Sequence, residues 1–146
     1  MATANDVAAY LVLKLKHTDT MKLQKLLYYS QGWSLAWDGV PLFDDRIEAW
    51  ANGPVVPSVF RNHKGRFVVT DWSAFGDAKT LTKSEQETVD VVLRHYGKST
   101  GQALADLTHT ERPWLEARAS TPLGHSSKAE VKKDTMQDFF GGLASS

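Results

Sequence analysis

The segment between residues 20 and 38 constrains the fold most strongly, because its apolar residues repeat at the spacing of an α-helix. The residues that follow this period of about 3.6 are Leu23, Leu26, Leu27, Ser30, Trp33 or Ser34, and Trp37. Capping residues precede the segment at positions 17–20, and Asp38-Gly39 forms a turn after it. The sequence therefore predicts one long helix, with Lys22, Lys25 and Tyr29 towards its other side.

Two features of this helix point to close packing or to a binding surface. Gly32 lies in mid-helix, where glycine costs about 1 kcal/mol relative to alanine, so another element is expected to pack closely there. Tyr28 and Tyr29 point about 100° apart on an ideal helix, so one of them must face outward or towards another element. Core packing is the first interpretation, and an exposed aromatic anchor for a protein partner is the second.

Capping signals and apolar spacing elsewhere predict a compact, mainly α-helical fold of six or seven helices. A first helix is expected from Thr3 or Asn5, and Thr82 and Glu85 form a capping box for a later one. Pro57 and Pro113 each suit the first turn of a short helix. A last helix should contain Met136, Phe139 and Phe140.

Two short segments have the character of strands. Residues 46–50 alternate between polar and apolar side chains, and residues 67–70 are rich in β-branched residues. Residues 52–54 carry a turn signal between them. The expectation is a small β-ribbon in which 46–50 pairs with 67–70.

The composition limits the size and class of the protein. The chain has 146 residues, no cysteine, and 17 basic against 17 acidic side chains. This length predicts one domain over residues 1–140, followed by a flexible tail over 141–146. No signal peptide or membrane span is apparent, so a cytoplasmic location is expected. The zero net charge argues against a protein that relies on phosphate contacts.

Two local patterns leave other functions open. Thr108-His109-Thr110-Glu111 could be part of a hydrolase site, although a loop or capping role for His109 is the simpler interpretation. Basic residues cluster at 61–66 between Phe60 and Phe67, which could hold a single-stranded nucleic acid. The usual nucleotide-binding, esterase and zinc-protease motifs do not occur.

Four segments together resemble a known family. Residues 21–33 resemble the K-L-Q-K-L-L-Y-Y-x-Q-G-W segment of the Panacea antitoxin domain family, which includes SocA-like and GepA-like phage-associated proteins. The segments 41–43 with 47–50, 53–57 and 107–114 follow in the same order, and the last resembles T-H-x-E-x-P-W. The resemblance covers about residues 5–140.

The resemblance implies a mainly helical antitoxin of a toxin–antitoxin pair, often in a prophage, that binds its protein toxin directly. At least one SocA-like member is an adaptor that delivers its toxin to a Clp-type protease. The family implies no enzyme activity and no catalytic, cofactor-binding or metal-binding residues. Some members have an additional DNA-binding segment, for which this chain has no room.

The aromatic helix, the 50–60 segment and the basic loop are the candidate partner-binding surface, since interfaces combine an aromatic centre with a polar rim. The candidate residues are Tyr28, Tyr29, Trp33, Trp50, Phe60, Arg61 and Lys64. Self-association through a symmetric patch is a further alternative.

Overall fold

The computed structural model describes residues 1–146 and contains seven α-helices, one short 3₁₀ helix and four very short strands. In chain order the elements are α1 (Ala4–Leu15), β1 (Thr18–Asp19), α2 (Thr20–Asp38), β2 (Glu48–Trp50), β3 (Gly53–Val55), α3 (Pro57–His63), β4 (Val68–Val69), η1 (Ala78–Thr80), α4 (Lys83–Tyr96), α5 (Gly101–Thr108), α6 (Arg112–Arg118) and α7 (Lys133–Ala144). The predicted mainly helical fold is confirmed. None of the helices is long and apolar enough to span a membrane.

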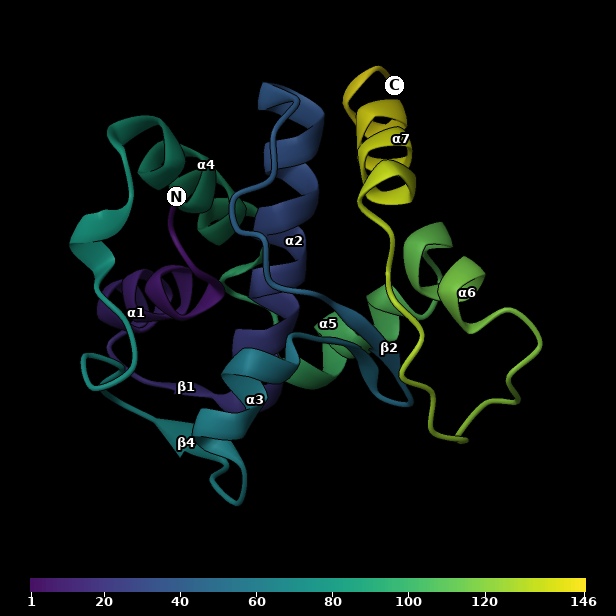
Figure 1. Cartoon of the computed structure of the whole chain (residues 1–146), viewed down its shortest axis with the longest axis horizontal. Coiled ribbons are helices and arrows are strands. Elements are labelled where there is room, and N and C mark those ends of the chain that lie inside the picture. Colours follow the sequence, from purple (N-terminus) through teal and green to yellow (C-terminus); the bar gives the residue numbers. More distant parts are fainter.

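Helix α2 is the centre of the fold. It packs against α1 and α4 on one side and against α7 on the other, while α5 and α3 contact it as well (Figure 1). Its predicted boundaries hold, because the Asp19 side chain accepts a hydrogen bond from the Lys22 amide and Gly39 ends the helix in the left-handed conformation. Every residue from Leu23 to Gly32 is buried. The helix is therefore enclosed on all sides and has no solvated face along this stretch.

The buried polar residues of α2 hold other segments of the chain in place. Gln31 Oε1 accepts hydrogen bonds from the amides of Leu42 (2.7 Å) and Phe43 (3.3 Å), and its Nε2 donates to the Phe43 carbonyl (2.8 Å). Gln24 Oε1 accepts from the Val56 amide (2.8 Å), one residue before α3. These side chains satisfy loop backbone groups that would otherwise be buried without partners.

The close approach predicted at Gly32 is confirmed, and the partner is α7. A Cβ atom at Gly32 would overlap the ring of Phe140, which is fully buried beside Tyr28 and Trp33. Helix α7 lies alongside α2, although the two are distant in sequence (Figure 1). It continues to Ala144, four residues into the segment expected to form a tail.

The predicted pairing of residues 46–50 with 67–70 is wrong. Strand β2 instead pairs with β3 through a tight turn at Ala51-Asn52, and β4 pairs with β1 immediately before α2. The short turn places β3 directly beside β2, so β3 occupies the edge of β2 at which residues 67–70 were expected to pair. The other edge of β2 is covered by residues 129–131, through the bonds Ala49 N to Ala129 O and Val131 N to Ile47 O (2.8 Å each).

Candidate protein-binding groove

The two tyrosines of α2 are core residues. Tyr28 and Tyr29 are both 0% exposed, and both hydroxyls donate to Oε1 of Glu111 at 3.1 Å. Their spacing required one of them to face either solvent or another element, and both face other elements. Their use as exposed anchors for a partner is not compatible with this burial, so that part of the prediction is wrong.

Glu111 is a buried carboxyl group held between these tyrosines. Burial raises its pKa from 4.5 to about 7, and the two hydroxyl donors only partly oppose this. Burial, followed by the charge of Glu111, also raises the pKa values of Tyr28 and Tyr29. The arrangement therefore favours a protonated Glu111 below neutral pH.

Glu111 should make the fold less stable as the pH rises from about 4.5 to about 7. Over this window the folded state keeps a proton that the unfolded state has lost, so the free energy of unfolding decreases. We expect Glu111→Gln, which keeps the acceptor for both tyrosines, to match the wild type near pH 4.5 and to exceed it by about 3 kcal/mol near pH 8. Urea unfolding at both pH values measures this difference, and equal stability at pH 8 would contradict it.

His109 does not combine with Glu111 in a catalytic arrangement. Its ring stacks on Trp114 with centroids 4.3 Å apart, and no hydrogen bond joins it to Glu111. Burial lowers the pKa of His109, and its Nε2 has no hydrogen-bond partner. No three His, Asp or Glu side chains in the chain are placed to hold a metal ion.

Trp33 lies one helical turn beyond Tyr29 on α2, and its ring contacts Trp37 and Phe140. It is half-buried in the second half of α2, where its Nε1 donates to the Tyr96 hydroxyl (3.0 Å) and its ring stacks on Trp37. Trp50 and Phe60 instead come together between β2 and α3, with ring centroids 4.8 Å apart. The structure thus divides the predicted aromatic surface into two places.

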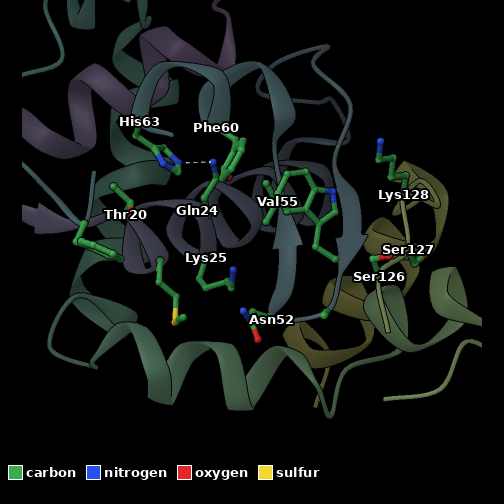
Figure 2. A pocket seen from close by; sticks show the side chains of 14 residues that line it. Thr20, Gln24, Lys25, Asn52, Val55, Phe60, His63, Ser126, Ser127 and Lys128 are labelled. Atoms are coloured by element: carbon green, nitrogen blue, oxygen red, sulfur yellow. Dashed lines mark hydrogen bonds between the residues drawn. The ribbon is translucent and has the colours of Figure 1, made fainter. Parts of the chain in front are cut away.

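Trp50 and Phe60 form part of a groove of about 530 Å³, which we call the α2–α3 groove (Figure 2). Its lining comes from the first turns of α2, the β2–β3 hairpin, α3 and the loop 126–128. The lining residues are Thr20, Met21, Gln24, Lys25, Trp50, Ala51, Asn52, Val55, Phe60, His63, Phe67, Ser126, Ser127 and Lys128. They include two lysines and no carboxylate, so the groove combines apolar surface with positive charge.

The basic loop is not a continuous cationic surface. His63 is buried in the groove wall, where its Nε2 lies 2.9 Å from Gln24 Nε2 and therefore accepts a hydrogen bond as neutral imidazole (Figure 2). Burial lowers its pKa accordingly. Arg61 and Lys64 are exposed, but neither lines the groove. They lie on and just after α3, next in the chain to the lining residues Phe60 and His63.

Most lining residues of the groove were not among the predicted partner-binding candidates, and Lys25, Phe67 and Lys128 are three of them. Lys25 follows the helical period onto the side opposite the apolar stripe, yet it is only 2% exposed. Phe67 belongs to the predicted strand 67–70, although its side chain is 85% exposed. Lys128 lies in a loop without any motif, so no local pattern could have identified it.

Most of the motif residues have a clear role in contacts within the fold. Gln24 and Gln31 hold loops, Glu111 accepts from both tyrosines, and Trp114 Nε1 donates to the Trp50 carbonyl (2.9 Å). The motif residues therefore hold the residue 42–43 loop and α6 against α2, and they fix both ends of the β2–β3 hairpin. That hairpin in turn forms one wall of the groove.

The fold and the groove define a class: small, mainly helical domains with an open surface that is lined by aromatic and cationic side chains. Within this class, the family model described as SocA-like antitoxin, Panacea domain, matches residues 23–115, well over half of the chain. The chain belongs to this family, as its resemblance predicted. The match extends from α2 into α6 and leaves the loop 126–128 outside it. No curated protein and no solved structure matches the chain.

Proposed function

We propose that this protein is the cytoplasmic antitoxin of a toxin–antitoxin pair and that it neutralises a protein toxin by binding it directly. The match to the SocA-like antitoxin family is the observation that carries this proposal. The α2–α3 groove supports it, because exposed aromatic and apolar surface beside positive charge is typical of a protein-binding site.

The contact surface should extend beyond the groove itself. A stable interface buries about 800 Å² on each partner, which is more than one groove supplies. The exposed side chains of Arg61 and Lys64 adjoin the lining residues Phe60 and His63 in the chain and would give a polar rim. A toxin surface with negative charge would complement this rim.

Co-expression with the product of the adjacent gene tests the proposed function. We expect that product to stop growth when expressed alone, and this chain to restore growth and to co-purify with it in a stoichiometric complex. A harmless neighbour, or rescue with no complex and no loss of toxin, would contradict the proposal.

Direct inhibition and delivery to a Clp-type protease predict different results in the same assay. An inhibitor rescues growth in a host that lacks the protease, and the toxin remains at its normal level. An adaptor fails to rescue in that host, and the toxin is depleted only where the protease is present. Measuring the toxin level in both hosts therefore identifies the mode of neutralisation.

The rim should accelerate toxin binding through its charge. We expect the double substitution Arg61→Glu with Lys64→Glu to lower the association rate constant by about tenfold at low salt, because opposite charges steer partners together. Lys79→Glu with Lys83→Glu changes the net charge equally on exposed residues outside the groove and should have a much smaller effect. Surface plasmon resonance at two salt concentrations measures both, and equal effects would place the binding surface elsewhere.

A further inference from the structure

A buried lysine without an ion-pair partner lies in the wall of the α2–α3 groove. Lys25 is 2% exposed, and its Nζ makes one hydrogen bond, to the Pro54 carbonyl at 3.2 Å. An ammonium group has three donors, so this group is under-satisfied. The ion pairs of the protein all involve Arg46 or Arg112, and none involves Lys25.

The backbone beside Lys25 is shaped to keep this side chain in place. Gly53 has a φ of +115°, and a Cβ atom there would lie 2.7 Å from Lys25 Cε and 2.8 Å from Thr108 Oγ1. A side chain at position 53 would therefore be strained and would displace the lysine. Burial lowers the pKa of Lys25 to about 8, which leaves it mostly protonated at pH 7.

Asp19 and Glu48, two acidic residues next to lining residues of the groove, already have other partners. Asp19, whose charge favours the protonated form of Lys25, caps α2 through the Lys22 amide at 2.8 Å. Glu48 binds Arg46 through one oxygen and the Trp50 indole through the other, at 2.9 Å each. Since buried charges in proteins are normally paired, an anion from another molecule would complete the pairing of Lys25.

The surroundings of Lys25 identify the kind of molecule that would supply the anion. Figure 2 shows Lys25 between Thr20 on one side of the groove and Ser126 and Lys128 on the other. The rings of Trp50 and Phe60 lie in the same lining, as does the exposed ring of Phe67. A peptide segment has the required combination, because an acidic side chain and a neighbouring apolar side chain can occupy the groove together.

We propose that Lys25 receives the carboxylate of an aspartate or glutamate on a toxin segment that lies in the α2–α3 groove. An aromatic or aliphatic residue next to that acid packs against Trp50, Phe60 and Phe67. The identity of the partner as a toxin rests on the proposed function, whereas the recognition of an acidic and apolar segment rests on the groove itself.

Selection of displayed random peptides on the full chain tests the groove without knowledge of the toxin. The parallel selection uses Lys25→Met, which keeps a side chain of similar length without its charge, and Lys83→Met is the matched control at an exposed site. We expect peptides enriched on the wild type and on Lys83→Met to carry Asp or Glu beside an apolar residue. Their affinity should fall by at least about 30-fold on Lys25→Met, as for a lost buried charge pair.

A double-mutant cycle shows whether the peptide acid and Lys25 contact each other. Replacing the acid by its amide (Glu→Gln or Asp→Asn) should weaken binding to the wild type by a similar factor and have little effect on Lys25→Met. Phe67→Ala provides a second test on an exposed residue that does not threaten the fold, and it should lower affinity several-fold.

Three results would overturn the proposal: no enriched peptides, no preference for acidic residues, or equal binding to the wild type and Lys25→Met. If Lys25→Met fails to fold, equal peptide binding by the wild type and Phe67→Ala overturns it instead. These results are distinct from failure of the proposed function, which appears as absent rescue in co-expression. A chain that selects acidic peptides but rescues no growth would retain the groove assignment and lose the antitoxin assignment.

Discussion

Gln31→Met should lower the free energy of unfolding by about 4 kcal/mol, since it leaves three buried backbone groups without partners at about 1–3 kcal/mol each. These groups are the amides of Leu42 and Phe43 and the carbonyl of Phe43. Both residues are fully buried, so water cannot replace the lost hydrogen bonds. Domains of this kind have a total stability of about 5–15 kcal/mol, so much of it would be lost.

Urea unfolding followed by tryptophan fluorescence measures this effect. Gln102→Met is the matched control, because Gln102 is exposed and its amide bonds only to Asp106 within one helix. The control should change the free energy of unfolding by less than about 0.5 kcal/mol. A loss below about 1 kcal/mol in Gln31→Met would show that the residue 40–43 loop does not depend on this side chain.

Gly32→Ala should destabilise the protein by about 3 kcal/mol, although alanine is the better helix former. The new methyl group would overlap the ring of Phe140. That ring cannot easily move, because it is fully buried against Tyr28, Tyr29 and Trp33. The strain should appear as separation of α7 from α2, with a lower midpoint in urea.

Gly141→Ala is a control of the same chemistry. Gly141 also lies in a helix, but nothing lies within 4 Å of a Cβ atom there, so alanine should stabilise the protein by up to about 1 kcal/mol. Adding Phe140→Leu to Gly32→Ala should recover part of the loss, since a smaller side chain makes room for the methyl group. A destabilisation that is equal at the two glycines would show that contact with Phe140 is not its cause.

Gln31 and Gly32 lie next to each other on α2, and both substitutions are expected to destabilise the protein because this part of the helix is buried. Helix α2 is buried on all sides between Leu23 and Gly32, yet it contains Gln24, Lys25 and Gln31. The two glutamines are satisfied by loop backbone, whereas Lys25 is satisfied only in part. The glutamines use their hydrogen bonds within the fold, whereas the Lys25 ammonium keeps donors that are free for a ligand. This contrast points to Lys25 as a binding residue.

The sequence by itself determined the local elements and the family. The N-cap at Thr3, which was one of two predicted, the capping box at Thr82 and the helix starts at Pro57 and Pro113 are found as expected. A cap or a helical period depends on residues within one or two turns, so it can be recognised in the chain directly. The close contact at Gly32 was also predictable, because glycine in mid-helix costs stability relative to alanine and is expected where a neighbouring element packs too closely for a side chain.

Only the tertiary structure decided the strand partners, the burial of the polar face of α2 and the position of the groove. Strand pairing was predicted wrongly because several edges of similar composition were available, and the turn at Ala51-Asn52 selects among them. Lys25 and Tyr29 were expected on the side of the helix opposite its apolar stripe, and α5, α7 and the β2–β3 hairpin cover that side. Burial depends on segments far away in the sequence, and a helical period gives the direction of a side chain without showing what lies there.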